Sequence, residues 1–285
     1  MQTRWLLNVF LLFLVAALAT AVYFSRNTQD SPVQLTGIDK DSIQTIVIPR
    51  EQGDIRLSKQ NNEWTMETPY QLPTHEFRVK GLLGLLNATI EKTYNLNDLE
   101  LKQFGLEPPR AIIRFDNTEI HFGKTNPVNQ QRYLRVNDKL FLLKEQLYPL
   151  ISSQPSSFVD ISPLPKNIRI NKISMPELSV YKNDQGLWQS DDATQNNADR
   201  IQQLIENWQS VQAFGVHGYM QRTSLGVVNI EHADGKIQFD ITSFEPWLIL
   251  AWSDAGVEYH FDAGLKDKLL QLPEVTTTNA AVPNN

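Results

Sequence analysis

Residues 43–64, with the sequence IQTIVIPREQGDIRLSKQNNEW, decide the fold class because they contain two predicted strands, a turn and a tryptophan in quick succession. The β-branched run at 43–48 predicts a first strand, and alternating apolar and polar residues at 55–59 predict a second, half-buried strand. Asn61-Asn62 supplies residues that favour a turn, and Trp64 follows it. This order indicates an antiparallel hairpin.

The same order of elements recurs later in the chain. Strands are predicted at 168–173 and 178–181, and the turn Asp184-Gln185-Gly186 then leads to Trp188, 124 residues after Trp64. Each copy continues with an amphipathic helix, two hairpins and a short closing helix. In the first copy the predicted helix spans 76–92, the hairpin strands span 111–115, 119–122, 133–136 and 140–143, and the closing helix lies at 145–151. In the second copy the predicted helix spans 198–212, the hairpin strands span 226–231, 236–242, 247–252 and 257–261, and the closing helix lies around 265–269.

The chain is therefore expected to be an α+β protein with two tandem similar modules, each made of antiparallel β-hairpins packed with one amphipathic helix. The modules are predicted at 28–160 and 161–272. A proline- and serine-rich connection at 152–165 separates them, and the polar residues 273–285 are predicted to be a disordered tail.

The N-terminal 27 residues are predicted to form a cytoplasmic stub and a transmembrane anchor. Residues 5–24 carry no charge and are almost all apolar, and 20 helical residues cover about 30 Å, the thickness of a bilayer core. A cleaved signal peptide is the alternative, because Ala17-Leu18-Ala19 has the small-residue pattern of a cleavage site. The working expectation is a single-pass inner-membrane protein whose bulk is periplasmic.

Composition excludes several function classes. The chain has no cysteine, which rules out disulfides and cysteine-ligated zinc sites. Its 26 basic and 32 acidic residues give a net charge of −6, which argues against a nucleic-acid partner.

No catalytic motif stands out. The chain lacks the His-Glu-x-x-His pattern of zinc proteases, the Gly-x-Ser-x-Gly elbow of hydrolases and a complete phosphate-binding loop. His232 and His260 lie near Glu231 and Glu258 on predicted strands, but two further ligands would be needed for a metal site. The chain is therefore predicted not to be an enzyme and to have no cofactor, no metal and no catalytic residue.

Aromatic residues suggest one binding surface. Phe244, Trp247 and Trp252 concentrate apolar surface around a proline-containing connection and could bind a partner, although burial in the core of an edge strand is the alternative. Trp64 and Trp188 occupy equivalent positions in the two copies, so they are expected to be packing anchors for the helices.

The segment Phe104-Gly105-Leu106-Glu107-Pro108-Pro109 lies ahead of the predicted strand at 111–115, and Phe122-Gly123-Lys124 ends the next strand. Together with Trp64, these residues resemble the bacterial domain of unknown function numbered 4340, over residues 43–160 and more loosely over 165–272. A structural role is expected for the motif: Gly105 can adopt a positive φ, Leu106 can anchor the turn, and Pro108 and Pro109 favour an extended exit.

The resemblance implies a membrane-anchored envelope protein, since some members look linked to gliding-motility-type ABC transporter auxiliary subunits. It implies no catalytic residue. The sequence is therefore interpreted as a non-enzymatic, membrane-anchored extracytoplasmic protein that acts as an interaction or assembly module of an envelope complex, with ABC transporter subunits among the candidate partners. The alternative is a small-ligand or glycan-binding module with a groove between the two repeats.

Overall fold

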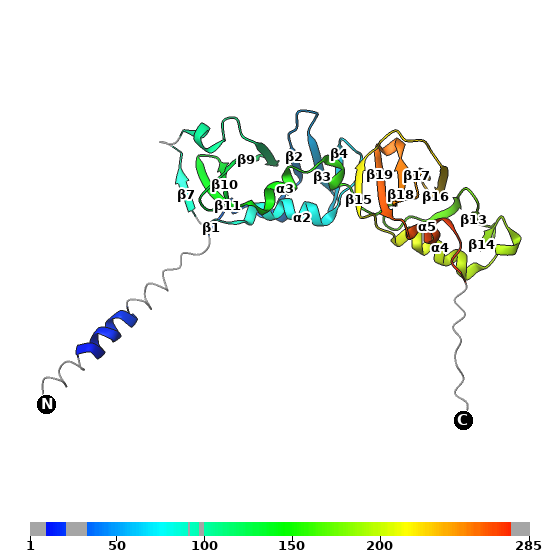
Figure 1. The fold of residues 1–285 in the computed structure, drawn as a ribbon, viewed down its shortest axis with the longest axis horizontal. Helices are drawn as coiled ribbons and strands as arrows, with labels where there is room; N and C mark the ends of the chain where they lie inside the picture. The colour runs from blue at the N-terminus through cyan, green and yellow to red at the C-terminus, as the bar shows by residue number, and fades with distance from the viewer. Residues whose placement is uncertain (1–9, 21–32, 91, 97–99, 275–285) are drawn as a thin grey trace, which may run out of the picture. The chain divides into compact units, whose positions relative to one another are not determined.

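The computed structural model describes residues 10–20, 33–90, 92–96 and 100–274. Two large antiparallel sheets and a few short helices make up this part of the chain, so the α+β class is supported (Figure 1). A further, two-stranded sheet pairs β1 (Val33–Gln34) with β6 (Thr89–Ile90).

The first large sheet has nine strands in the order β5-β4-β3-β2-β8-β9-β10-β11-β7. In β8 of this sheet, buried and half-buried residues alternate, and Ala111, Ile113 and Phe115 are the buried ones. The bounds are β2 (Thr45–Ile48), β3 (Ile55–Gln60), β4 (Glu63–Thr68), β5 (Leu72–Pro73), β7 (Lys92–Asn95), β8 (Ala111–Phe115), β9 (Thr118–Thr125), β10 (Gln131–Val136) and β11 (Lys139–Lys144).

The second large sheet has eight strands in the order β14-β13-β12-β16-β17-β18-β19-β15. The hairpin of β16 and β17 turns at Ala233-Asp234, one residue before the predicted Asp234-Gly235, and keeps a continuous register from Gly226↔Ile241 to His232↔Gly235. The bounds are β12 (Ile170–Ser174), β13 (Ser179–Lys182), β14 (Trp188–Ser190), β15 (Gly215–Gly218), β16 (Gly226–His232), β17 (Gly235–Ser243), β18 (Trp247–Trp252) and β19 (Val257–Asp262).

The two sheets repeat one connectivity. If β2, β3 and β4 are matched with β12, β13 and β14, and β8 to β11 with β16 to β19, the strand orders coincide and only β5 has no counterpart. In both sheets a strand between the main helix and the first strand of the hairpins, β7 or β15, pairs with the last hairpin strand. Neither β7 nor β15 was predicted from the sequence.

The helices are short. They comprise α2 (Glu76–Gly84), α3 (Tyr148–Ile151), α4 (Ala198–Ser210) and α5 (Leu265–Leu270), and the 3-10 turns η1 (Lys40–Ser42), η2 (Leu85–Asn87), η3 (Leu101–Phe104), η4 (Glu145–Leu147), η5 (Pro155–Phe158), η6 (Ala193–Gln195) and η7 (Ser253–Ala255). The predicted helix at 76–92 was too long, because the chain tightens into η2 after Gly84 and then becomes extended. Gly84 weakens the helix, and Thr89-Ile90 is β-branched.

Helices α4 and α5 lie beside one another against one face of the second sheet (Figure 1). Trp208 of α4 is fully buried, its indole N–H donates to the Leu269 carbonyl oxygen at 2.8 Å, and its ring stacks on Phe239 of β17. One core of aromatic and branched side chains therefore joins helices and sheet.

The predicted connection at 152–165 is packed rather than loose. Phe158 and Val159 are buried, the His75 N–H donates to the Phe158 carbonyl at 2.7 Å, and the Ala213 N–H donates to the Ile161 carbonyl at 2.9 Å. The proline and serine content indicated a linker, but it could not reveal these backbone partners.

Spatially, the chain divides into two compact units. One comprises residues 1–42, 83–110 and 119–147, and the other comprises 43–82, 111–118 and 148–285. These units follow the clustering of contacts, whereas the modules at 28–160 and 161–272 follow the repeated order of elements, so the module boundaries stay a prediction.

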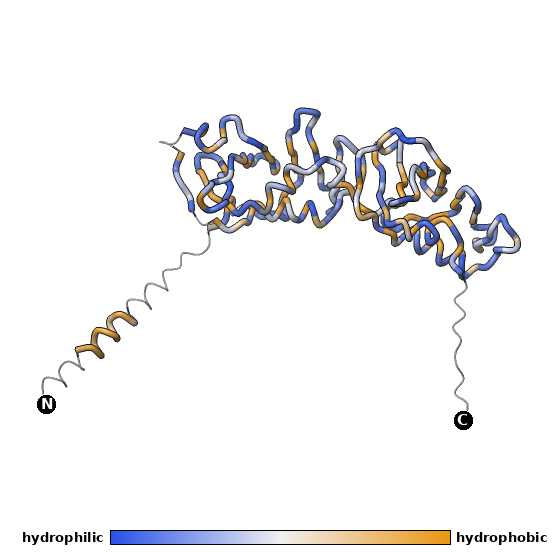
Figure 2. The backbone as a smooth tube through the Cα atoms, viewed as in Figure 1, coloured by the Kyte–Doolittle hydropathy of each residue, from blue (hydrophilic) through white to orange (hydrophobic). Residues whose placement is uncertain are grey.

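Residues 10–20 are helical, and Figure 2 shows them hydrophobic along their whole length. Among the described residues, no helix is both long and apolar enough to span a bilayer. The remainder of the predicted span, residues 5–9 and 21–24, lies outside the described residues, as do residues 275–285 of the predicted tail.

Candidate functional site

The three predicted partner-binding residues have different surroundings. Trp247, the first residue of β18, is 47% exposed. Trp252, the last residue of β18, packs edge-to-face on Phe239 in the helix-covered core, with ring centroids 5.6 Å apart. Phe244 is half-buried under the ammonium group of Lys266, which lies 4.6 Å from its ring centroid. Only Trp247 is therefore well placed to meet a partner.

An exposed phenylalanine completes the surface at Trp247. Phe214 is 58% exposed, and its ring meets the indole of Trp247 edge-to-face with centroids 5.6 Å apart. Its N–H donates to the carbonyl of His260 at 3.0 Å, so the residue continues the pairing of β15 with β19. We call Phe214 and Trp247 the aromatic pair.

A buried carboxylate lies on the strand beneath the aromatic pair. Glu258 of β19 has no exposed surface, and its Oε1 accepts from Nε2 of His260 at 2.8 Å and from Arg222 at 3.0 Å. Its other oxygen, Oε2, accepts from the Met220 N–H at 3.2 Å. These donors compensate the cost of burying the charge.

These bonds hold a loop against the sheet. The segment between β15 and β16, residues 219–225, is tied to Glu258 through Met220 and Arg222, and the Ser224 hydroxyl donates to Asp240 at 3.1 Å. Alternation along β19 places Glu258 and His260 on the face opposite Tyr259, which packs in the helix-covered core. The loop therefore covers the face of the sheet that α4 and α5 do not cover.

The imidazole of His260 connects the charged cluster to the aromatic pair. It is 7% exposed and lies 6.3 Å from Phe214, 6.1 Å from Trp247 and 4.4 Å from the ring of His217. Since a carboxylate only accepts hydrogen bonds, His260 holds a proton on Nε2. The aromatic pair therefore packs beside side chains whose positions are fixed by hydrogen bonds.

The surroundings of His217, on the neighbouring strand β15, favour its neutral form. Burial lowers the pKa of His217 below its usual 6.5, and the nearby His260 and Arg222 lower it further, whereas Glu258 raises it. The Gln154 amide lies 3.3 Å from Nδ1 of His217 and can donate to it when the ring is neutral.

Tyr70 packs against the same strands. A Cβ added at Gly256 would lie 3.5 Å from the Tyr70 ring, and one added at Gly218 would lie 3.1 Å from its hydroxyl oxygen. Burial raises the pKa of the Tyr70 phenol. The contact at Gly218 is tight, whereas the distance at Gly256 is an ordinary van der Waals contact.

The groups of this cluster differ in chemistry and in exposure. No group of three or more histidines and carboxylates suited to a metal ion occurs within the described ranges. Glu258 is fully buried and engaged by Arg222 and His260, which suits it to holding the loop. The exposed groups are apolar rings, which suit contact with another surface.

The family-motif residues form a separate structural site. Gly105 ends η3 with a φ of 66°, Leu106 is buried, and the ring of Phe104 meets that of Tyr133 at 4.9 Å. A Cβ on Gly123 would lie 2.3 Å from the Phe104 carbonyl oxygen, so only glycine fits there. Pro108 and Pro109 follow, and Leu106 and Pro109 form an isolated β-bridge.

The paired tryptophans are both half-buried. Trp64 lies on β4, and Trp188, the first residue of β14, borders a pocket together with the start of α4. The fully buried tryptophan of the second sheet is Trp208 instead.

Phe214, His217 and Arg222 were not among the residues predicted from the sequence. The alternation of β19, which places Glu258 beside His260, was the available signal, and the analysis noted this pair only as a poor metal site. The partners come from β15, which was not predicted, and from a loop whose position depends on the folded sheet.

Comparison with known proteins places the chain in a family. A family model described as "Domain of unknown function (DUF4340)" matches residues 34–229. No curated protein and no solved structure gives a significant match. The match includes the motif at residues 104–109, Gly123, both paired tryptophans and β15, and it covers more than half of the chain. The protein therefore belongs to the DUF4340 family, as the motif indicated.

Proposed function

We propose that the protein is a non-enzymatic, membrane-anchored interaction module that binds an envelope protein through the aromatic pair, Phe214 and Trp247. The observation that carries this proposal is two neighbouring aromatic rings, 58% and 47% exposed, in edge-to-face contact above a hydrogen-bonded cluster. Exposed aromatics on a rigid support provide contact area without much loss of conformational entropy on binding.

The rim of the surface indicates the chemistry of the partner. Glu245 and Asp262 are exposed, and Asp262 is the cross-strand neighbour of Trp247. A partner with an apolar side chain flanked by basic groups would complement this surface, because opposite charges at a rim favour encounter and orientation. That the partner is a subunit of an ABC-type transporter stays a prediction.

The anchor is part of the same proposal. The described helix at 10–20 exposes Phe10, Leu12 and Phe13 by 65%, 75% and 77%, which fits immersion in lipid better than contact with water. With the apolar residues on either side in the sequence, it would form a single inner-membrane span with the bulk of the chain in the periplasm. N-terminal sequencing of the membrane-purified protein tests this: Met1 is expected, and a start after Ala19 or Ala21 would indicate a cleaved signal peptide.

Photo-crosslinking in cells tests the binding surface. A photoreactive amino acid replaces Trp247 or Phe214 in the full chain, and Val128, which is 90% exposed, serves as the control position. One and the same protein should be crosslinked from 214 and 247 but not from 128. Crosslinks that do not exceed those of the control would contradict the proposal.

A further inference from the structure

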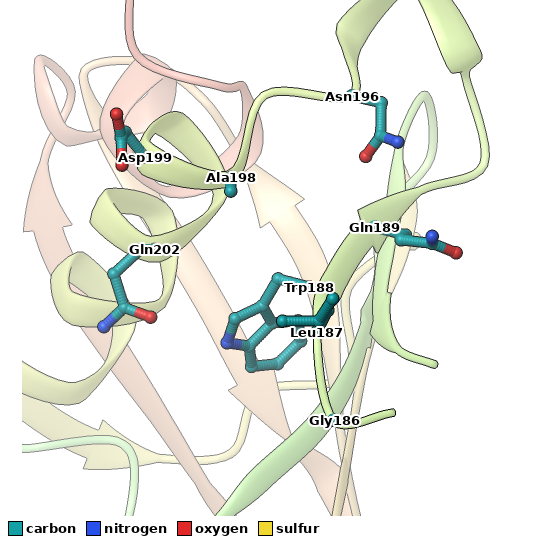
Figure 3. A pocket seen from close by; sticks show the side chains of 8 residues that line it. All are labelled: Gly186, Leu187, Trp188, Gln189, Asn196, Ala198, Asp199 and Gln202. Atoms are coloured by element: carbon teal, nitrogen blue, oxygen red, sulfur yellow. The ribbon is translucent and has the colours of Figure 1, made fainter. Parts of the chain in front are cut away.

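A pocket in the second sheet is separate from the aromatic pair. It lies between β14 and the start of α4 (Figure 3), has a volume of about 400 Å³ and is open to solvent on one side. Its lining consists of Gly186, Leu187, Trp188, Gln189, Asn196, Ala198, Asp199 and Gln202.

An aromatic ring forms one wall of the pocket. Figure 3 shows the indole of Trp188 pointing from β14 toward α4, with Ala198 and Gln202 on the opposite side. The ammonium group of Lys182, the cross-strand neighbour of Trp188, lies 5.1 Å from the ring centroid. This cation–π contact helps to fix the ring.

The turn that presents Trp188 is also fixed. The side-chain oxygen of Asn183 accepts from the N–H groups of Gln185 at 3.0 Å and Leu187 at 2.9 Å, and Gly186 has a φ of 76°. Leu187 is 60% exposed at the pocket edge. An apolar wall held by its own turn is preorganised for a ligand.

The polar groups of the lining are amides and one carboxylate. Asn196 uses its amide oxygen to accept from the Ser190 N–H at 3.3 Å, and Gln202 uses its amide nitrogen to donate to Glu206 at 2.9 Å. The other amide atom of each is therefore the one that a ligand would meet. Figure 3 shows the Asp199 carboxylate directed away from the Trp188 indole, and none of the lining residues is cationic.

From this combination we propose that the pocket binds a neutral saccharide. The C–H face of a sugar ring can pack on Trp188, while adjacent hydroxyl groups, each both donor and acceptor, match the remaining amide atoms of Asn196 and Gln202. The lining itself holds no cation, but the Lys182 ammonium beside Trp188 would attract an anion, so inorganic phosphate has to be tested as a competitor. The inference does not depend on the aromatic pair, since the two sites share no residue.

Titration calorimetry on the full chain tests the proposal. Cellotriose, maltotriose and chitotriose are the probes, the detergent carries no sugar headgroup, and triglycine and inorganic phosphate are the competing ligand classes. At least one saccharide should bind with a Kd below about 1 mM. Failure of all three saccharides, or tighter binding of triglycine or phosphate, would overturn the proposal.

Variants then locate the binding. Trp188→Ala should weaken it at least about tenfold, while Trp64→Ala, at the matching position of the first sheet, should not. Gln202→Ala and Gln203→Ala form a second matched pair that keeps the core intact, because both side chains are exposed on α4 and only Gln202 lines the pocket. Weaker binding is expected for Gln202→Ala only, and equal affinity in both glutamine variants would exclude this pocket.

Discussion

Glu258 shows how a single residue positions the binding surface. Its carboxylate is fully buried and accepts from His260, Arg222 and the Met220 N–H, so the loop and the strand below the aromatic pair depend on one negative charge. An uncharged amide at this position would present a donor to a site built entirely of donors.

Glu258→Gln is therefore expected to lower the free energy of unfolding by about 2 kcal/mol, measured by urea denaturation. Glu231→Gln is the matched control: Glu231 is half-exposed and lies 3.7 Å from Lys172, and such surface pairs contribute about 0–1 kcal/mol. Equal stability of the two variants would contradict the structural role of Glu258.

Gly123 tests the family motif at the same scale. In Gly123→Ala the new methyl group would lie 2.3 Å from the Phe104 carbonyl oxygen and 3.0 Å from Leu106, so the motif loop must shift. We expect a loss of about 2 kcal/mol in thermal or urea unfolding.

Gly84→Ala is the control for Gly123→Ala. Gly84 has a φ of −60° and no neighbouring atom within 4 Å of an added Cβ. This variant should gain about 0.5–1 kcal/mol, because alanine loses less backbone entropy than glycine in a helix. Similar losses in both variants would show that the contact with Phe104 is unimportant.

His217 gives the fold a dependence on pH. Burial, with His260 and Arg222, lowers the pKa of His217 in the folded protein by more than Glu258 raises it, so the unfolded chain binds the proton more readily. The contribution of neutral His217 is fully present above pH 6.5 and is lost as the pH falls through the lowered folded pKa.

Urea unfolding from about pH 7.5 to about pH 5.5 should therefore show decreasing stability, and His217→Gln should flatten part of that decrease. The remainder is expected from His75, whose pKa burial also lowers. A His217→Gln variant with the wild-type pH dependence would show that His217 is not responsible.

Among the elements, α4 is the helix that the sequence predicted best. Its start is fixed by Asn197, whose side-chain oxygen accepts from the Arg200 N–H at 3.1 Å, and its buried face carries Ile201, Leu204, Ile205 and Trp208. Asn197→Ala should cost about 1 kcal/mol in urea unfolding, whereas Asn197→Asp should keep the cap and stay near wild-type stability. An Asn197→Ala variant with wild-type stability in urea would show that the cap does not contribute to stability.

The elements that the sequence failed to predict have weak local signals. Residues 92–95 of β7 are all exposed, and β15 has glycine at both ends, so neither shows the alternation that reveals a half-buried strand. Both strands exist because the last hairpin of each sheet offers them backbone partners. This explains why the cluster of His217, Glu258 and Arg222 could not be assembled from sequence.

For the whole molecule, the repeated order of hairpins was readable because each turn carries a local residue signal, such as Asp234-Gly235. Both sheets accordingly have the same order of equivalent strands. The binding surface could be predicted from the sequence only in part. Trp247 was a predicted candidate, whereas its neighbour Phe214 reaches it only through the pairing of β15 with β19.

The proposed function requires that the aromatic pair hold one envelope partner, and co-purification of the full chain from solubilised membranes measures this most directly. Wild type and Phe77→Ala, a control at an 80% exposed apolar residue, should retain one partner in constant proportion, as judged by quantitative mass spectrometry. The double variant Phe214→Ala/Trp247→Ala should lose that partner at least about tenfold. Isolation of the chain alone, or equal recovery of the partner with the double variant, would contradict the account.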